Sequence, residues 1–260
     1  MLIAFLKMQA QGNDFVILDF LGQEIPSYDF PALASSICDR HFGVGADGLV
    51  TIQASVAADA RMVIYNSDGS RAEMCGSALR CVAGLLMDKH AVAEPRIFTD
   101  SGLKQAHREA DNIIVNLGTA KILEADFPAG NFVGDLVDIG NPHYVVFCDD
   151  LVNNPHLKFG AMLEHHPGFP AAVNVHFVQV QGRDKMQMKI WEHACGPTLA
   201  CGTGAASAVY SGIRKELLDN EVTVGVPGGV LKIIYQQESN TLQLCGPVSQ
   251  VFSGDYTWKT

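Results

Sequence analysis

The pattern of apolar and polar positions occurs twice along the chain. The stretch MVIYNSDGSRAEMCGSALR at 62–80 aligns without a gap with MKIWEHACGPTLACGTGAA at 188–206. Each copy has an alternating apolar run, a polar turn, and then Cys-Gly at the start of a run of small and apolar residues. Alternation is typical of a strand, and the run after the turn is typical of a helix. The pattern therefore predicts strand, loop and helix twice, with Cys75 and Cys201 at the two helix starts.

The rest of the chain is predicted mainly as strands. Residues 2–20 suggest two strands around the turn QGNDF, and residues 26–37 suggest a helix. The two repeat helices are expected from Gly76 to about His90 and from Gly202 to about Leu217. The first of them is apolar or small on all sides, which indicates a buried helix. Most other segments alternate and are predicted as antiparallel strands.

The chain is expected to contain two similar halves. Further pairs of segments resemble each other at nearly the same offset, among them QGNDFVILDF and VDIGNPHYVVF. A solenoid would need a shorter period and more copies. The periodicity fades into turn residues between Gly118 and Gly134, so we place the boundary there. The expected domains are residues 1–117 and residues 118–247.

Composition narrows the range of partners. The net charge of −10 disfavours nucleic acid and anionic membranes as partners. The first residues turn polar too soon for a signal peptide, and no window approaches the ~20 apolar residues of a membrane span. The 7 cysteines are odd in number and scattered, which suits a reducing cytoplasm better than a disulfide framework. We expect a cytoplasmic protein with a small-molecule substrate; a homodimer is an option that the sequence leaves open.

A cysteine at a helix start is a candidate acid–base group. The unpaired N–H groups and the positive end of the helix dipole favour a thiolate and also bind a carboxylate. If two such thiols face each other, one can take the α-proton of a bound acid and the other can return a proton to the opposite face. The backbone amides would stabilise the enediolate that forms between these steps. The residues expected to supply these amides are Gly76, Ser77, Gly202, Thr203 and Gly204.

Other roles for the cysteines compete with this one. A lone free cysteine is more often part of the core than catalytic, and this is the expectation for Cys38, Cys81, Cys148 and Cys245. Cys195 is the one cysteine expected to pair with Cys201 on oxidation. No C-x-x-C spacing, glycine-rich phosphate loop or Schiff-base lysine motif is evident. We therefore expect neither a metal nor a cofactor.

Several motifs resemble the diaminopimelate epimerase family over essentially the whole chain. They are QGNDF (11–15), RHFGVGADGL (40–49), NSDGSRAEMCG (66–76), GNPH (140–143), VNVHFVQV (173–180) and TLACGTGA (198–205). The resemblance implies an α+β fold of two pseudo-symmetric domains, each an antiparallel sheet curled round a central helix, with the active site in the cleft. It also implies that the last strand, within 248–260, returns to the first domain.

The resemblance assigns roles by matched position. Cys75 and Cys201 would be the acid–base pair, and His143 and Glu192 would lie beside the reacting amine and carboxylate. The residues that would line the substrate pocket are Asn13, Asn66, Asn141 and Asn174. Taken singly, Asn13 and Asn141 are equally well explained as turn residues. Likewise, His143 alone suggests a core histidine, and Glu192 alone a solvated charge.

The departures from the family pattern concern the far end of the substrate. The family has an arginine directly after the glutamate, where this chain has His193, and histidine does not replace a bidentate guanidinium. The following turn reads ACGPT (194–198), and the first helix opens CGSA (75–78). We therefore expect an amino-acid racemase for a substrate without a distal carboxylate. Histidine is the first candidate, because the related histidine racemases share the two-cysteine design.

Three alternatives to this reading stay open. One is diaminopimelate epimerase itself with a variant distal pocket. Another is a proline-type racemase or a different isomerase of the same fold. The third, of another class, is a binding protein that kept the cleft and lost the chemistry; the retained thiols, His143 and Glu192 argue against it.

Overall fold

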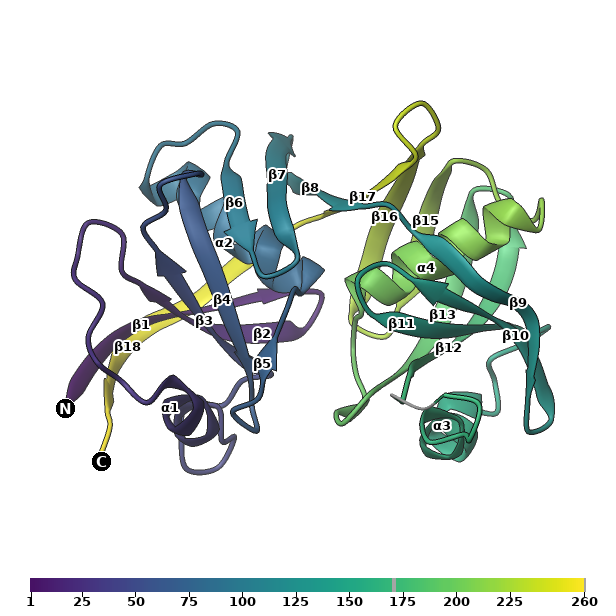
Figure 1. Ribbon diagram of the computed structural model, residues 1–260, viewed down its shortest axis with the longest axis horizontal. Coiled ribbons are helices and arrows are strands. Elements are labelled where there is room, and N and C mark those ends of the chain that lie inside the picture. Colours follow the sequence, from purple (N-terminus) through teal and green to yellow (C-terminus); the bar gives the residue numbers. More distant parts are fainter. Residues whose placement is uncertain (170–171, 260) are drawn as a thin grey trace. The chain divides into compact units, whose positions relative to one another are not determined.

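The computed structural model describes residues 1–169 and 172–259 (Figure 1). The described residues form two compact units, Met1–Val115 with Pro247–Thr260 and Asn116–Gly246. Thr260, the last residue of the expected returning strand, lies outside the described residues. Each unit is described by itself below.

Both units have the same order of elements apart from one outer strand, which comes last in the first unit (β18) and first in the second (β9). The first contains β1 (Leu2–Ala10), β2 (Asn13–Asp19), α1 (Phe30–Ile37), β3 (Gly48–Gln53), β4 (Ala60–Asn66), β5 (Arg71–Ala72), α2 (Gly76–Lys89), β6 (Arg96–Thr99), β7 (Gly102–Glu109), the start of β8 (Asn112–Gly118) and β18 (Ser249–Thr257). The second contains β9 (Lys121–Ala129), β10 (Phe132–Asp138), β11 (Pro142–Phe147), α3 (Pro155–Glu164), β12 (Asn174–Gly182), β13 (Lys185–Glu192), β14 (Gly196–Pro197), α4 (Gly202–Arg214), β15 (Glu221–Val226), β16 (Gly229–Gln236) and β17 (Thr241–Gly246).

The strand pairings of the first unit also correspond to those of the second. In the first unit β1–β2, β3–β4, β4–β5, β6–β7 and β7–β8 are antiparallel, whereas β2–β3 and β4–β6 are parallel. In the second unit β10–β11, β12–β13, β13–β14, β15–β16 and β16–β17 are antiparallel, whereas β11–β12 and β13–β15 are parallel. The α+β class is confirmed, but each sheet is mixed rather than purely antiparallel. The parallel pairs arise because a helix-containing crossover joins their strands, as parallel pairing requires.

The two repeat helices are buried along most of their length. In α2 the residues Gly76 to Leu86 are all buried, as predicted from its apolar and small residues. In α4 the first eight residues are buried and are glycine, alanine, serine, threonine and valine, which let the sheet approach the helix closely. This helix ends at Arg214, before the expected Leu217, because Glu216 takes a left-handed φ of 60°. None of the helices in the described residues combines the length and apolar character that a membrane-spanning helix needs.

Two sequence expectations about elements are wrong. The region 118–134, expected to be turn-rich, contains β9 and the start of β10. Most residues of β9 are exposed, so the apolar–polar alternation that marks a half-buried strand is missing there. The first helix begins at Phe30 rather than Pro26, because the Asp29 side chain accepts from the Ala32 N–H and caps it.

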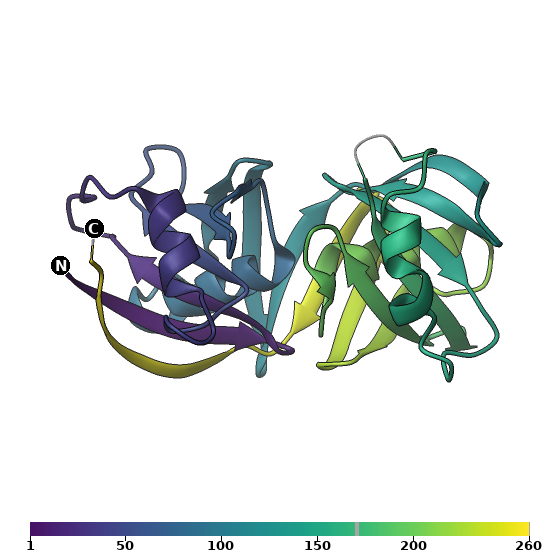
Figure 2. The same cartoon turned by 90° about the horizontal axis from the view of Figure 1, so that it is seen from below.

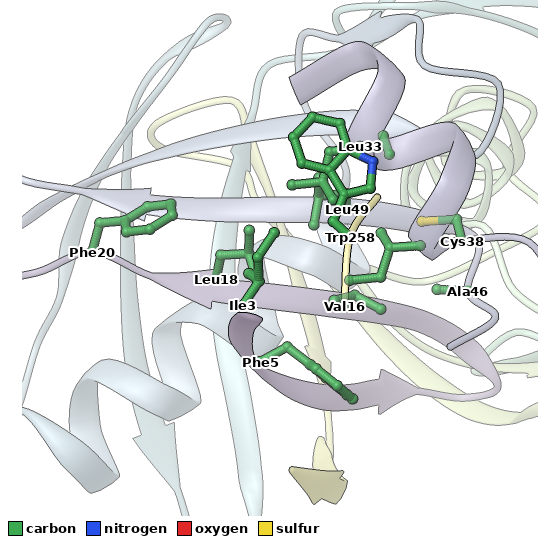
Figure 3. Close-up of a cluster of buried hydrophobic side chains, with 12 residues drawn as sticks. Ile3, Phe5, Val16, Leu18, Phe20, Leu33, Cys38, Ala46, Leu49 and Trp258 are labelled. Carbon is green, nitrogen blue, oxygen red and sulfur yellow. The ribbon is translucent and has the colours of Figure 1, made fainter. Parts of the chain in front are cut away.

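The core of the first unit lies on both faces of β2. Val16 and Leu18 belong to a buried cluster with Leu33 of α1 and Trp258, while Phe15 and the alternate residues point to the opposite face. Figure 3 shows this cluster under α1. The strand β18 runs antiparallel to β1 from Leu2 to Gln9, and the two lie side by side in Figures 1 and 2. Chain start and chain end are thereby held in one sheet.

Candidate active site

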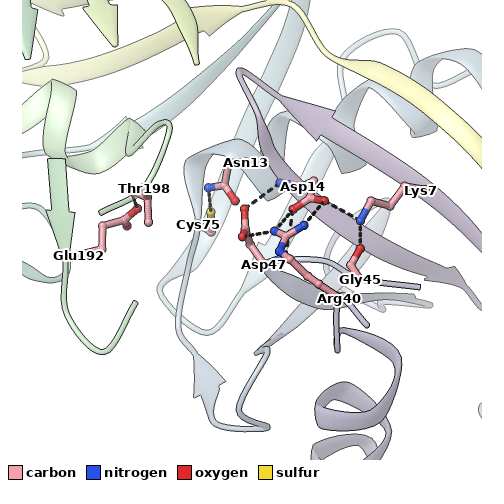
Figure 4. A network of polar contacts seen from close by, with 9 residues as sticks. All are labelled: Lys7, Asn13, Asp14, Arg40, Gly45, Asp47, Cys75, Glu192 and Thr198. Atoms are coloured by element: carbon pink, nitrogen blue, oxygen red, sulfur yellow. Dashed lines mark hydrogen bonds and ion pairs between the residues drawn. The ribbon is translucent and has the colours of Figure 1, made fainter. Parts of the chain in front are cut away.

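The first of the two predicted thiols stands at the N-terminus of α2. Cys75 is the N-cap residue, with an extended backbone (φ −140°, ψ 122°), and is half-buried. The side-chain amide of Asn13, at the start of β2, donates to its Sγ atom over 3.9 Å (Figure 4). Gly76 and Ser77 follow in the first helical turn and are buried, and the Ser77 hydroxyl has no hydrogen-bond partner within the described chain. This end of α2 thus combines a thiol with backbone N–H groups at the positive end of a helix dipole.

An ion-pair network supports the turn that carries Asn13; its Lys7 and Asp14 side chains are largely buried, whereas Arg40 and Asp47 are about half exposed. Asp14 accepts from the Lys7 ammonium over 2.6 Å and from the Arg40 guanidinium over 2.8 Å (Figure 4). Arg40 also pairs with Asp47 at 2.7 Å, and Asp14 and Asp47 accept each other's backbone N–H. Burial alone would raise the pKa of Asp14, but the hydrogen bonds from Arg40 and Lys7 outweigh it and lower the pKa. Asp14, Arg40 and Asp47 lie within the motifs QGNDF and RHFGVGADGL, but Lys7 lies outside them, and the sequence does not predict the network.

Asn66 ends β4 and is engaged in the following turn. Its side-chain amide donates to the Ser70 hydroxyl over 2.9 Å, and its backbone N–H donates to the Ser70 carbonyl over 2.8 Å. The Asn66 side chain therefore stabilises this turn. Contact of Asn66 with the substrate stays a prediction.

The second thiol occupies the same position in the second unit. Cys201 is the N-cap residue of α4 with an extended backbone (φ −135°, ψ 107°), and it is only 4 % exposed. The Gly204 N–H donates to its Sγ atom over 3.4 Å, and the Thr203 hydroxyl lies 3.6 Å away. Gly202, like Thr203, is buried in the first turn.

The protonation of Cys201 differs from the sequence expectation. A helix start was expected to favour the thiolate, yet burial raises the pKa of Cys201 well above its usual value, and the negative charge of Glu192 raises it further. The contacts from Thr203 and Gly204 act in the other direction but are outweighed. Cys201 therefore rests as a neutral thiol, which suits a proton donor.

Glu192 stands at the end of β13, where the tight turn 192–195 begins. Its carboxylate accepts from the Thr198 hydroxyl over 2.5 Å (Figure 4). Its hydrogen bond to Cys201 contributes to the raised pKa of that thiol. The side chain is thus held beside the thiol and is more than a solvated rim charge.

His143 and Asn141 form a second polar group in this unit. The Nε2 atom of His143 lies 2.9 Å from the Asn141 side-chain oxygen, and its Nδ1 atom lies 2.9 Å from Nε2 of His176. Both rings are fully buried. Burial lowers the pKa of both histidines, that of His176 to about 3, and the neighbouring ring adds to the effect on His143. Both are therefore neutral at physiological pH.

The same two histidines and Cys201 have ligand atoms within 4.8 Å of one another, the spacing of a candidate metal centre. The 2.9 Å separation of the two ring nitrogens is a hydrogen-bond distance. Two nitrogens at 2.0–2.1 Å from a tetrahedral zinc ion would stand roughly 3.3 Å apart. We therefore interpret the cluster as a hydrogen-bond chain beside the thiol.

Asn174 and His193 lie in contact with each other. The Asn174 side chain accepts from the His193 backbone N–H over 3.1 Å and donates to the Pro142 carbonyl over 3.0 Å. It thereby fastens the start of β12 to the segment that contains His143. The His193 ring is half exposed, with 51 % of the side chain accessible.

Glu164 is a site residue that the sequence analysis missed. This last residue of α3 has a buried carboxylate that accepts from His193 Nδ1 (2.8 Å), the Ala194 N–H (2.9 Å) and the Trp191 indole (2.7 Å). Burial alone would raise the pKa of Glu164, but these donors outweigh it and lower the pKa. Its sequence context, an irregular helix ending before His165, carries no signal of this contact.

Solved structures show which fold class this is. A Bacillus anthracis protein of the phenazine biosynthesis PhzF family has a TM-score of 0.75 at 14 % identity, covering 99 % of this chain and 100 % of that one. A hydroxyproline epimerase from Agrobacterium vitis has a TM-score of 0.71 at 15 % identity, covering 98 % and 92 %. The chain therefore has the fold shared by PhzF proteins and this epimerase.

Sequence comparison identifies the family within this class. The family model described as diaminopimelate epimerase matches residues 5–123 and 136–251. The diaminopimelate epimerase of Desulforudis audaxviator is 39 % identical over 97 % of this chain and 98 % of its own length. That of Pelotomaculum thermopropionicum is 37 % identical over 98 % and 99 %. The chain belongs to the diaminopimelate epimerase family, and its class of activity is that of an isomerase, an epimerase or racemase.

Proposed function

We propose that the chain inverts the α-carbon of a free amino acid without a cofactor, with Cys75 and Cys201 as the two acid–base groups. The observation that carries the proposal is the equivalence of the two cysteines. Each is the extended N-cap residue of a buried helix, at the same place in the order of elements of its unit. A fold that builds the same thiol twice supplies one base and one acid for a reaction in which a proton leaves one face of a carbon and returns to the other.

The proposed reaction needs one thiolate and one thiol. The thiolate takes the α-proton, and the electron pair of the broken C–H bond passes into the carboxylate as an enediolate. The opposite thiol then donates its proton to the same carbon, so the enzyme ends with the two protonation states exchanged. The raised pKa of Cys201 supports its role as the proton donor in one direction. Backbone amides at the helix starts hold the carboxylate as its charge grows.

The substrate is proposed to lack a distal carboxylate, with histidine as the first candidate. His193 stands where the family resemblance places a carboxylate-binding arginine, and its Nδ1 atom is occupied by Glu164. A buried carboxylate at this position disfavours a second carboxylate nearby, because like charges repel.

A second candidate is epimerisation of diaminopimelate with a different distal contact. Relatives named diaminopimelate epimerase at 37–39 % identity over nearly the whole chain favour it. The substrate is the point on which the two candidates differ, whereas the two-thiol reaction is common to both.

Exchange of the α-proton in D₂O tests both the two-thiol reaction and the choice of substrate. The purified protein is incubated with a panel of L-amino acids and with diaminopimelate, and α-deuterium incorporation and inversion are followed by NMR and chiral chromatography. We expect inversion of an amino acid without a distal carboxylate, and a loss of about 10²- to 10⁴-fold in C75A and in C201A. The matched control is C148A, a half-buried cysteine on no helix start.

Each unfavourable outcome removes a defined part of the proposal. Turnover of diaminopimelate alone would reject the altered substrate and leave the two-thiol reaction. Full activity in C75A or C201A would reject the two-thiol reaction. Tight binding of an amino acid with no exchange in any panel member would indicate a binding protein.

A further inference from the structure

The hairpin turn between β1 and β2 has a buried glutamine at its tip. Ala10 pairs with Asn13, so Gln11 and Gly12 form a two-residue turn, and both have positive φ, 50° and 82°. Asparagine, aspartate or glycine is preferred at the first position of such a turn. Glutamine is not favoured at positive φ, and a polar turn residue is usually exposed, yet Gln11 is only 6 % exposed. Contacts of the Gln11 side chain therefore outweigh this local cost.

These contacts come from α2 and from the segment that returns from the second unit at Pro247. The Arg80 guanidinium donates to the Gln11 side-chain oxygen over 2.7 Å, and the Gln11 amide donates to the Pro247 carbonyl over 3.3 Å. Arg80 also donates to the Pro247 carbonyl, over 3.4 Å. Because a guanidinium only donates and a carbonyl only accepts, this orientation of the Gln11 amide is fixed. Arg80 is fully buried, so the turn is fastened to the interior of the first unit.

The same turn contacts α2 at a second point, the thiol. Asn13, two residues after Gln11, donates to the Cys75 Sγ atom at the helix start (Figure 4). Arg80 lies five positions after Cys75 on this helix. The bond between Gln11 and Arg80 is the shorter of the two contacts, 2.7 Å against 3.9 Å, and its charged donor makes it the stronger. The strong bond thus sets the distance between turn and helix, on which the contact at the thiol depends.

The second unit builds the equivalent place from apolar residues. In the gap-free alignment of the two repeat copies Arg80 falls on Ala206, which is fully buried on α4. Alignment of the Gly-Asn pairs of the two turns places Gln11 opposite Ile139, which is 4 % exposed. An apolar pair is thus sufficient for the fold, and replacing both partners of a buried hydrogen bond by apolar groups is often nearly neutral for stability. This comparison favours a role for the polar pair beyond stability.

We propose that Gln11 and Arg80 are positioning residues for the Cys75 thiol: their hydrogen bond fixes the turn on α2 so that the Asn13 amide donates to Sγ. An N–H donor stabilises a thiolate more than a neutral thiol, so this contact favours the form that takes a proton. The inference rests on the proposed function for the reaction that the thiolate carries out, whereas the contact itself is tested without any substrate.

Substitution at Gln11 separates the shape of the turn from the reach of the side chain. Asparagine is favoured at positive φ but is one methylene shorter, so Q11N should keep the turn and lose the bond to Arg80. Q11N also keeps the charge of Arg80, whereas R80M removes the donors and N13A removes the donor to the thiol. A110N is the matched control, since Ala110 (φ 50°) has the same position in the exposed two-residue turn between β7 and β8.

The first readout is the rate at which iodoacetamide alkylates each thiol, followed at pH 7 without substrate by tandem mass spectrometry. The reagent reacts with the thiolate, whose fraction falls when the N–H donor is displaced, although the remaining thiolate is somewhat more nucleophilic. We expect Cys75 to react about threefold or more slowly in each of the three variants, and Cys201 to change by less than about twofold. The control should match the natural chain. An unchanged Cys75 rate in Q11N would overturn the inference, as would faster alkylation of both thiols, the result of a merely loosened fold.

The second readout is a double-substitution cycle. If Gln11 acts through Asn13, Q11N has no further contact to remove once N13A is in place, so the double variant should react at the rate of N13A. Independent structural effects would multiply, and a further slowing of about threefold in the double variant would overturn the inference. The same cycle on kcat/KM should again show no added loss from Q11N. Absence of any turnover in the natural chain would reject the proposed function, while the alkylation rates would still decide the role of the pair.

Discussion

The Nδ1 atom of His193 lies 2.8 Å from a carboxylate oxygen of Glu164. The same carboxylate accepts from the backbone of Ala194 and from the indole of Trp191, so three donors from one short segment converge on one buried acid. The carboxylate engages the ring through Nδ1, although 51 % of the His193 side chain is accessible. The turn thus holds a histidine in a fixed orientation, which a freely rotating side chain would lack.

Removing Glu164 should therefore destabilise the protein. In E164A, three donors that are satisfied now would have to find water or stay unpaired, and a lost partner costs about 1–3 kcal/mol per buried group. We expect a fall of about 3 kcal/mol in the free energy of unfolding, measured by urea denaturation with intrinsic tryptophan fluorescence. E124A, on the exposed face of β9, is the control and should change it by less than about 0.5 kcal/mol. Equal effects of the two substitutions would contradict the assigned role.

Stability should also fall as the solution is acidified, in two overlapping ranges. The pKa of Glu164 is lowered in the folded state, because its donors outweigh burial. Its contribution to stability is present above the unfolded pKa of about 4.5 and is lost as the pH falls through the lower folded pKa. The histidine pair acts at higher pH. Above about 6.5 both rings are neutral in both states, but below it the unfolded chain binds protons that the folded chain excludes.

The histidine part of this dependence can be isolated with H176Q. The pKa of His176 is lowered by burial to about 3, so between pH 6 and pH 4 each such ring removes about 1.4 kcal/mol of stability per pH unit. Urea unfolding at pH 7, 6, 5 and 4 should give a slope shallower by about this amount in H176Q than in the natural chain. H156L serves as a comparison, because its less buried ring should change the slope less. Parallel curves for H176Q and the natural chain would show that His176 titrates in the folded state.

The ion pair between Lys7 and Asp14 predicts unequal losses in the free energy of unfolding when one or the other partner is replaced. The Lys7 side chain is only 7 % exposed, and among the residues that the structure describes Asp14 is its one carboxylate partner. In D14N the ammonium stays buried without that partner, and breaking a buried ion pair from one side costs about 3–5 kcal/mol. In K7M the Asp14 carboxylate keeps Arg40, so the expected loss in the free energy of unfolding is below about 1.5 kcal/mol. If calorimetry showed K7M to be as costly as D14N, the assigned pairing would be wrong.

The sequence was sufficient for features that repeat or alternate. The doubled strand–turn–helix pattern predicted both helix starts to the residue, because Cys75 and Cys201 are followed by the same change from polar to small and apolar residues. The strand β9 escaped prediction because it is an exposed strand with no alternation to detect. The parallel pairings follow from the crossovers through α1 to α4 and do not appear in the burial pattern of any single strand.

The residues that were missed act through contacts distant in sequence. Glu164 meets His193 across 29 positions, and His176 meets His143 across 33. Periodicity describes which face of an element is buried, but not which buried polar group meets which. The raised pKa of Cys201 was missed for the same reason, since burial and Glu192 together outweigh the helix dipole that the local sequence revealed.

Position 193 provides the final test of specificity. An arginine there would offer a bidentate site to a distal carboxylate, but in H193R its nearest anion is the buried carboxylate of Glu164, which would hold the guanidinium. We therefore expect H193R alone to change little, whereas H193R combined with E164Q frees the guanidinium. The double variant should raise the ratio of kcat/KM for diaminopimelate over that for histidine by about tenfold or more, the value of one charge-assisted hydrogen bond. A ratio of two substrates is independent of the folded fraction, so the cost of losing Glu164 does not obscure the result. H165R, at the neighbouring exposed position, is the control for added charge. An unchanged ratio in the double variant would show that position 193 does not contact the distal end of the substrate.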